Sequence, residues 1–181
     1  MKGSAAFSTV SFGCTVKNVI AIKPHHFVDI LTAFGGGQRE FRPHPYGHVV
    51  HSVARELLAN RDMHLRIELG ADDICLPCCH NADGLCDDTI DTSFRPQAPT
   101  SKREWNLRID LRWCERLDLG QDDQLTARDL CVRIRDRASD IAAIYGEIPT
   151  ERMADRQAKL RKGLVKFWGG IEPNQTDRSD A

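Results

Sequence analysis

The sequence lacks the features that mark several large classes of protein. No apolar run approaches the roughly 20 residues that a membrane-spanning helix requires, so we expect no membrane segment. Neither sign of charge predominates, since 25 Lys and Arg stand against 26 Asp and Glu, whereas nucleic-acid-binding proteins usually carry a clear basic excess. There is no internal repeat and no EF-hand calcium loop. With 41% hydrophobic and 28% charged residues among 181, the composition is that of one globular domain.

A secretory signal is also missing from the first residues. Four hydroxyl residues between Ser4 and Ser11 interrupt the apolar stretch of about 7–15 residues that such a signal needs. We therefore expect a cytoplasmic protein, in which clustered cysteines more often bind metal or catalyse than form disulfides. Residues 1–14 are expected to be a flexible N-terminus, residues 171–181 a disordered tail, and residues 15–170 a single metal-binding domain.

The periodicity of hydrophobic residues predicts more helix than strand. A strand, two helices and a second strand come first, a unit whose strands can pair in parallel through a right-handed crossover. Residues 70–100, here called the Cys loop, contain three prolines and few periodic hydrophobic residues, and loops of that length are uncommon unless they are functional. The expected fold class is α+β, a helix-dominated single domain with a small sheet of two or more short strands and a long Cys-rich metal-binding loop. Strands are expected over 16–22 and 63–69, and helices over 25–34, 46–60, 102–119, 126–145 and 150–168.

The Cys loop carries the clearest indication of chemistry in the sequence. Cys75 and Cys78 form a C-x2-C pair, which lets two thiolates converge on one metal centre from a tight turn. Pro77 stiffens that turn, and Gly84 allows the chain to fold back and deliver Cys86, so the spacing is C-x2-C-x7-C. Three sulfur ligands are therefore expected to be local, and a fourth ligand has to come from elsewhere.

Cys114 is our candidate for the fourth ligand. It follows the Cys loop on the next predicted helix, beside Trp113, which could shield a cofactor. Cys79 and His80 compete with it locally. Cys131 occupies the hydrophobic stripe of its own predicted helix, where a free cysteine behaves as a small apolar residue.

The spacing of these cysteines favours one cofactor over another. Structural zinc sites are usually closed by two pairs of ligands, and the chain offers one pair and two isolated cysteines. Iron–sulfur clusters accept thiolates at more varied spacing, often with a proline nearby. We therefore favour an iron–sulfur cluster, of the 4Fe-4S type, with zinc as the alternative.

The histidines are the candidate acid–base groups. His25 and His26 follow the first predicted strand directly, a common place for active-site imidazoles, and a capping or surface role is the alternative. Because adjacent helical residues point in different directions, at most one of the two is expected to face a given site. His48 and His51 lie one turn apart on the second predicted helix and could reach a common ligand, whereas His64 is expected to be a polar-face residue of its strand.

Charged residues gather in two places. Asp72, Asp73 and other acidic residues surround the cysteines, and most are expected to cap turns or to keep the loop soluble. Six Lys and Arg between Arg152 and Lys166 make the last predicted helix basic. A solvated helical face is the plain interpretation of these cations, and a docking surface for an acidic partner is the alternative.

Two segments resemble a known family. Residues 23–32, Lys-Pro-His-His-Phe-Val-Asp-Ile-Leu-Thr, followed by Gly35-Gly36-Gly37, resemble the opening signature of the bacterial and archaeal domain-of-unknown-function 1284 family. Residues 70–78 with Gly84 and Cys86 are similar to the cysteine segment of the same family, and residues 117–126 to its later part. The resemblance covers roughly residues 20–145.

The resemblance implies an iron–sulfur protein of unassigned function. By similarity, its cluster ligands would be Cys75, Cys78 and Cys86, and its site residues would include His25 and His26. The chain departs from the family pattern where Asp29 stands in place of a cysteine and where residues 141–145 replace a Cys-rich stretch. Either the cofactor differs, or fewer cysteines hold it and one coordination position is filled by Asp29, by Cys114 or by nothing.

Three functions follow from these observations. The favoured one is an iron–sulfur protein whose cluster is held by the Cys loop and Cys114, and in which adjacent side chains act as acid or base in a redox or Lewis-acid enzyme on a small molecule. Those candidate catalytic residues are His25, His26, Asp29 and His48. The expected partners are a small-molecule substrate or a redox partner protein. The alternatives are a zinc-stabilised binding module that docks a partner on its basic helix, and a metal-free thiol enzyme with Cys78 or Cys79 as nucleophile.

Overall fold

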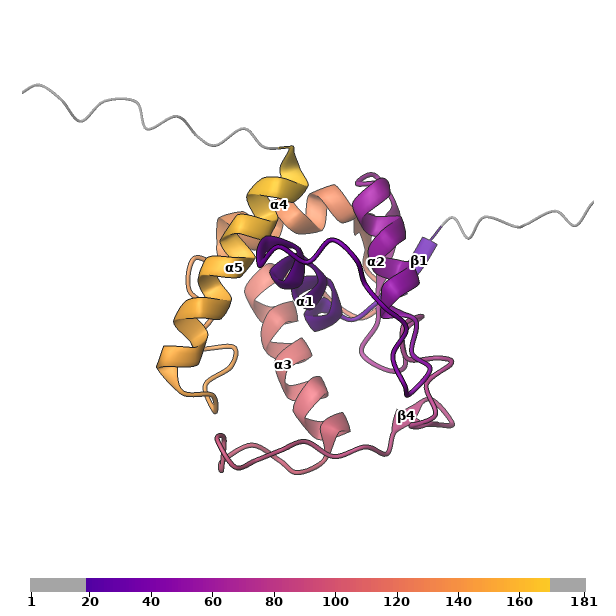
Figure 1. Cartoon of the computed structure of the whole chain (residues 1–181), viewed down its shortest axis with the longest axis vertical. Coiled ribbons are helices and arrows are strands. Elements are labelled where there is room, and N and C mark those ends of the chain that lie inside the picture. Colours follow the sequence, from indigo (N-terminus) through magenta and orange to yellow (C-terminus); the bar gives the residue numbers. More distant parts are fainter. Residues whose placement is uncertain (1–18, 170–181) are drawn as a thin grey trace, which may run out of the picture.

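Helices predominate in the computed structural model, which describes residues 19–169 (Figure 1). The predicted flexible ends, and Cys14 with them, lie outside the described residues. Within them, the α+β fold class is confirmed, with a three-stranded sheet and a separate two-stranded hairpin beside the helices. No helix of residues 19–169 is long and apolar enough to cross a membrane. The elements in chain order are β1 (Val19–Ile22), α1 (Pro24–Gly35), α2 (Val50–Ala59), β2 (His64–Ile67), β3 (Asn81–Ala82), β4 (Leu85–Cys86), α3 (Lys102–Leu117), β5 (Gln124–Thr126), α4 (Ala127–Arg137) and α5 (Thr150–Trp168).

The predicted parallel pairing of the first two strands is confirmed. β1 pairs with β2 in register from Val19 opposite His64 to Ile22 opposite Ile67, and α1 and α2 form the connection between them. The sequence did not predict β5, which pairs antiparallel with the other edge of β2 and gives the order β1-β2-β5. Because β1 and β2 are parallel, their carboxyl ends lie at the same end of the sheet, and Lys23, which follows β1, lies there near the start of the Cys loop.

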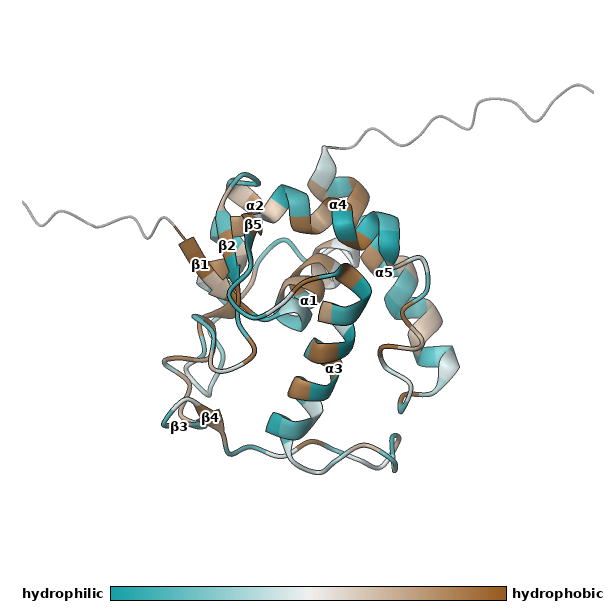
Figure 2. Ribbon diagram, turned by 180° about the vertical axis from the view of Figure 1, so that it is seen from behind, coloured by the Kyte–Doolittle hydropathy of each residue, from teal (hydrophilic) through white to brown (hydrophobic). Residues whose placement is uncertain are grey.

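α1 runs through the middle of the molecule, with α3 and α5 beside it (Figure 1). Its Phe27, Val28 and Leu31 side chains are fully buried, and Figure 2 shows hydrophobic residues along this helix and throughout β1. α1 and α5 pack backbone against backbone, because a Cβ added at Gly35 would lie 1.8 Å from the Lys159 carbonyl oxygen and one at Gly163 would lie 1.9 Å from that of Leu31. This contact fixes α1, and with it the two histidines in its first turn.

Two predicted helices are shorter in the structure. The helix expected over 46–60 begins at Val50, because Gly47 adopts a left-handed φ of 77° and breaks the helical path. The helix expected over 126–145 ends at Arg137. Beyond it, side chains replace helical hydrogen bonds, since Gln157 Oε1 accepts from the Ile141 N–H (2.9 Å) and Asp140 Oδ1 accepts from the Ala142 N–H (2.8 Å). Irregular chain over residues 138–149 therefore buries Ile141 and Tyr145, two of the apolar side chains that suggested a helix, together with Ile144.

The Cys loop has more structure than expected. β3 and β4 form a hairpin in which Asn81 pairs with Cys86, and the two residues of its turn, Asp83 and Gly84, have φ values of 51° and 84°. An Asp-Gly dipeptide is a strong signal for such a turn, although the hairpin was not predicted from it. The hairpin sets Cys86 opposite the turn that carries the other cysteines.

Candidate metal centre and its cavities

Three of the four predicted cysteine ligands line one small pocket. The chain folds back on itself after Asp72, with the Cys75 and Leu76 N–H groups both donating to the Asp72 carbonyl at 2.9 Å. The Cys78 N–H then donates to the Cys75 carbonyl at 2.9 Å, so the C-x2-C segment is a tight turn as expected. This turn and the β3–β4 hairpin enclose a hollow of about 30 Å³, here called the thiol pocket, lined by Lys23, Cys75, Cys78, His80 and Cys86 among others.

A fully buried carboxylate ties this turn to the start of α1. Asp72 accepts the Cys75 N–H at 3.0 Å through Oδ1 and the Lys23 N–H at 2.9 Å through Oδ2. The same Oδ2 accepts from His26 Nδ1 at 2.7 Å. Burial alone raises the pKa of Asp72, but His26 and these N–H donors outweigh burial and hold that pKa well below its usual range. An ionised Asp72 therefore joins the Cys loop, β1 and α1 at one point.

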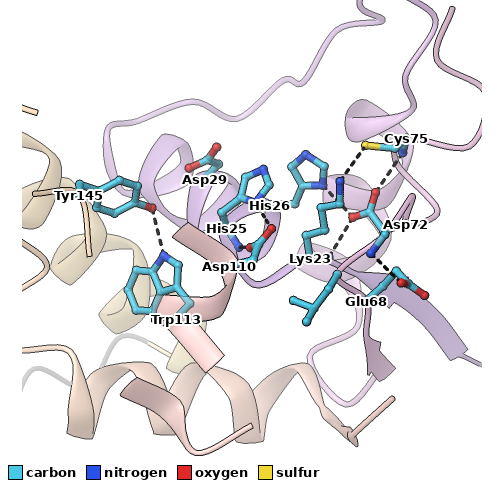
Figure 3. Close-up of polar contacts among 12 residues, drawn as sticks. Lys23, His25, His26, Asp29, Glu68, Asp72, Cys75, Asp110, Trp113 and Tyr145 are labelled. Atoms are coloured by element: carbon cyan, nitrogen blue, oxygen red, sulfur yellow. Dashed lines mark hydrogen bonds and ion pairs between the residues drawn. The ribbon is translucent and has the colours of Figure 1, made fainter. Parts of the chain in front are cut away.

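His26 is oriented by this carboxylate. The Nδ1–H donates to Asp72, so the second ring nitrogen, Nε2, faces away from that carboxylate (Figure 3). Burial lowers the pKa of His26, but the neighbouring charge and hydrogen bond of Asp72 outweigh burial, so the pKa is raised overall. Carboxylate–imidazole pairs of this kind fix the tautomer of metal-ligating and proton-transferring histidines.

His25 has the same arrangement with a different carboxylate. Its Nδ1–H donates to Asp110 Oδ2 at 2.7 Å and its N–H to Asp110 Oδ1 at 2.9 Å, and Asp110 lies fully buried on α3. The two imidazoles lie side by side with ring centroids 4.3 Å apart (Figure 3). Of the two, His26 alone lines the cavity beside the thiols, in keeping with the expectation that at most one would face a given site, whereas both rings line a neighbouring cavity.

A larger cavity adjoins the thiol pocket. It has a volume of about 210 Å³ and shares Cys75, Cys78, His80 and Cys86 with the pocket; we call it the histidine cavity, because His26 and His48 line its other walls. Burial, together with His44, His26 and Lys102, lowers the pKa of His48 to about 4, so this imidazole is neutral at pH 7. Of the predicted catalytic residues, His26, Asp29 and His48 thus share one cavity, while His25 lines the neighbouring one.

Asp29 is not a free base in this structure. It forms an ion pair with Arg156 of α5. Burial raises the pKa of Asp29, but Arg156 outweighs burial and the pKa is lowered overall. Asp29 therefore contributes a fixed negative charge to the wall of the histidine cavity.

The structure does not bring Cys114 to this group. Cys114 lines neither the thiol pocket nor the histidine cavity, and burial with the charges of Asp110 and Asp123 raises its pKa to about 11. The reason is helical geometry. Lys102, at the start of α3, reaches the histidine cavity, whereas Cys114 lies 12 residues further along the helix, about 18 Å away at 1.5 Å per residue. The local competitor His80 lines both hollows, with its Nδ1 2.9 Å from Asp87 Oδ1.

Two carboxylates that organise the site were not recognised from the sequence. Asp72 was expected to be one of several loop caps, and Asp110 was not singled out at all. The available signal for Asp110 was a charged residue beside Ile109 in the hydrophobic stripe of a helix, since charged residues are almost never fully buried unless they are paired. Lys102 and Asn106, which also line the histidine cavity, gave no signal in the sequence.

In the described residues, potential metal-ligand atoms gather most closely around the Asp72 carboxylate. Within residues 19–169, the single trio of His, Cys and acidic ligand atoms that lie within 4.8 Å of one another is His26, Asp72 and Cys75. The hydrogen bonds of Asp72 to His26 and to backbone N–H groups account for this trio without an ion. The sulfurs of Cys75, Cys78 and Cys86 are more widely spread around the thiol pocket.

Comparisons with protein families, with curated proteins and with solved structures find no match for this chain. The resemblance to the domain-of-unknown-function 1284 family therefore stays a prediction, and the function has to be argued from the site itself.

Proposed function

We propose that this chain binds an iron–sulfur cluster through Cys75, Cys78 and Cys86, and that the histidine cavity beside the cluster receives a small molecule. The observation that supports this most directly is the meeting of three thiols, from a turn and from a hairpin, around one hollow. That hollow opens on a second cavity whose walls carry an imidazole oriented by a buried carboxylate. Cavities with a few convergent polar groups are the usual form of small-molecule sites.

The spacing of the thiols favours a cluster over one zinc ion. Sulfur atoms around a single tetrahedral zinc lie about 3.8 Å apart, given zinc–sulfur bonds of about 2.3 Å. No three of the groups Cys75, Cys78, His80 and Cys86 have ligand atoms within 4.8 Å of one another, although all four line the same pocket. Ligands that share a pocket at wider spacing suit a centre with several metal atoms, each bound by one thiolate.

The surroundings of Cys75 also favour a metal-binding thiol over a nucleophile. Burial and the nearby Asp72 raise the pKa of Cys75 to about 12, and the Lys23 ammonium, with Nζ 3.8 Å from Sγ, offsets only part of this effect. A thiol of this kind keeps its proton at neutral pH until a metal displaces it, because metal binding and thiol deprotonation are coupled. Cys75 is therefore not the activated, low-pKa cysteine that a metal-free thiol enzyme would need.

The residues of the chain have distinct parts to play around such a cofactor. A cluster bound by three thiolates supplies a Lewis-acidic or redox-active iron. His26 holds or accepts a proton at Nε2, and Asp72 keeps the ring oriented for that exchange. Lys102, paired with Asp88 at 2.8 Å, and Asn106 offer hydrogen bonds to a ligand in the histidine cavity.

Metal analysis of protein purified without air tests this proposal. We expect brown protein with broad absorption near 400 nm, with iron and acid-labile sulfide in equal amounts and an electron paramagnetic resonance signal on reduction. Cys75→Ser and Cys86→Ser should lose the iron, whereas Cys131→Ser, whose thiol is buried between α4 and α5, should keep it. Colourless protein with one zinc per chain would instead support the zinc-stabilised module, and equal iron in all three variants would remove the ligand assignment.

A further inference from the structure

A further cavity lies next to the histidine cavity, on the side away from the thiol pocket. It has a volume of about 270 Å³, and the two share His26, Asp29, Lys102 and Asn106 as walls. We call it the arginine cavity, because Arg95 lines it and does not line the histidine cavity. A molecule beside the thiols can therefore extend past the two histidines into this second space.

The arginine cavity has three cationic side chains, and two of them are already paired. Lys102 Nζ donates to Asp88 Oδ2 at 2.8 Å. Arg156 forms the ion pair with Asp29 and donates to the Tyr145 hydroxyl at 2.8 Å. These two cations are neutralised by the protein itself, so neither of them calls for an anionic ligand.

Arg95 differs from both. Its Nε donates to the Asp91 carbonyl oxygen at 2.8 Å, and its two terminal nitrogens have no hydrogen-bond partner among residues 19–169. The guanidinium lies against two aromatic rings, 4.9 Å from the Phe94 centroid and 5.0 Å from that of Trp105. The Nε bond and the rings fix the plane of the group, which leaves two terminal donors arranged to take both oxygens of one carboxylate.

About half of the remaining wall of the arginine cavity is apolar, and His25, His26 and Asn106 are among its polar side chains. Trp105, Ile109 and Tyr145 line it and are each no more than 5% exposed. The Asp91 charge acts on Arg95 from nearby but takes no hydrogen bond from its terminal nitrogens. A guanidinium with both terminal nitrogens available beside these side chains suits a ligand with a single anionic group on a hydrocarbon body. Inorganic phosphate or a phosphate ester carries more charge and more acceptor oxygens than this one cation satisfies.

We propose that the arginine cavity binds an organic acid, with Arg95 holding its carboxylate and the apolar wall holding its body. Its other end then lies beside His25 and His26, on the side of the histidine cavity. The inference rests on the proposed function only in making this acid a substrate of the metal centre; its binding requires no metal.

Titration calorimetry on the full chain, purified without air, tests the inference. The probes are phenylacetate, its neutral isostere phenylacetamide, and inorganic phosphate. We expect phenylacetate to bind at least about tenfold more tightly than either of the others, since hydrogen bonds to an ionised carboxylate are stronger than those to a neutral amide. Arg95→Gln should weaken phenylacetate binding by about tenfold or more, and Arg95→Lys should restore only part of it. Arg103→Gln, an exposed arginine on α3 outside the cavity, should leave it unchanged.

Several results would overturn the inference. These are equal affinity for the acid and the amide, preference for phosphate, unchanged affinity in Arg95→Gln, or no binding of phenylacetate at millimolar concentration. Circular dichroism of each variant checks that the fold is kept. Repeating the titration with Cys75→Ser separates the two proposals. Phenylacetate binding by this variant without iron supports the present inference whatever the outcome for the cluster. Iron in the parent chain without phenylacetate binding contradicts the present inference and leaves the proposed function standing.

Discussion

The helical part of the molecule and the Cys loop are held together in different ways. α1 and α5 meet backbone to backbone, and their buried residues belong to one hydrophobic core. The Cys loop contributes little to that core, chiefly Ile74 and Ala98, and is attached through polar contacts such as those of Asp72. The helical part is therefore stabilised by packing, whereas the Cys loop depends on a buried charge and, under the proposed function, on a metal centre.

The largest expected effect breaks the helical part alone. Gly163→Ala should lower the free energy of unfolding by about 3 kcal/mol or more, because the added Cβ would lie 1.9 Å from the Leu31 carbonyl oxygen. Helix propensity by itself predicts the opposite sign, by about 1 kcal/mol. Urea unfolding followed by circular dichroism measures the change. Gly36→Ala is the matched control, since its Cβ would meet nothing closer than 3.4 Å, and a similar loss there would argue against the packing explanation.

The two buried carboxylates provide a sharper comparison. Asp72→Asn and Asp110→Asn should each cost about 2 kcal/mol of stability, since each weakens charge-assisted hydrogen bonds to a histidine and to backbone N–H groups. Only Asp72→Asn should also lower metal affinity, by about tenfold or more, because Asp72 positions Cys75. Urea unfolding and iron content of both variants are the measurements. Equal iron loss in the two would show that the carboxylates do not act on separate regions.

Removing the metal should loosen one region and leave the other. After treatment with a chelator under reducing conditions, we expect amide hydrogen exchange in the β3–β4 hairpin to speed up by about tenfold or more. Exchange in α1 should stay the same, because its protection comes from the α1–α5 contact. Mass spectrometry of exchanged peptides measures both. Unchanged exchange in the hairpin would mean that no metal supports the Cys loop.

The smallest effect concerns pH and the helical part. Hydrogen bonds from Arg112 and Arg108 lower the pKa of Glu147 from 4.5 to about 2. Because the folded pKa lies below the unfolded one, this stabilisation is present above pH 4.5 and is lost as the pH falls towards 2. It should amount to about 1 kcal/mol after allowance for solvent screening. Urea unfolding of Glu147→Gln at pH 6 and pH 3 should show a smaller difference than the parent chain, and an identical difference would exclude this pair as the cause.

The sequence predicted what local pattern determines. The amphipathic helices and the convergence of Cys75, Cys78 and Cys86 follow from residues close to one another along the chain. The parallel pairing of β1 and β2 was expected from the crossover that a strand–helix–helix–strand order allows. β5 was missed because its three residues form a strand only by pairing with β2. The helix predicted to reach Tyr145 was wrong because irregular chain can bury the same apolar residues when Gln157 and Asp140 take over the backbone N–H groups.

The organisation of the site was less predictable, because it depends on contacts between distant residues. Asp110 becomes meaningful only beside His25, 85 positions earlier in the chain. Cys114 was chosen for its nearness to the Cys loop in sequence, and the straight path of α3 carries it away from that loop. Arg95 has significance only because Trp105 and Phe94 hold it at a cavity that five separate segments enclose.

The paired histidines of α1 have one more consequence. Their side chains are neighbours, yet His26 is oriented by Asp72 of the Cys loop and His25 by Asp110 of α3. Any displacement of the loop, such as one that accompanies loading of a metal centre, would rotate the ring of His26 while His25 keeps its place. The ring nitrogen chemical shifts of His26 would then change with its hydrogen bond to Asp72 and report the state of the loop, while those of His25 would stay the same.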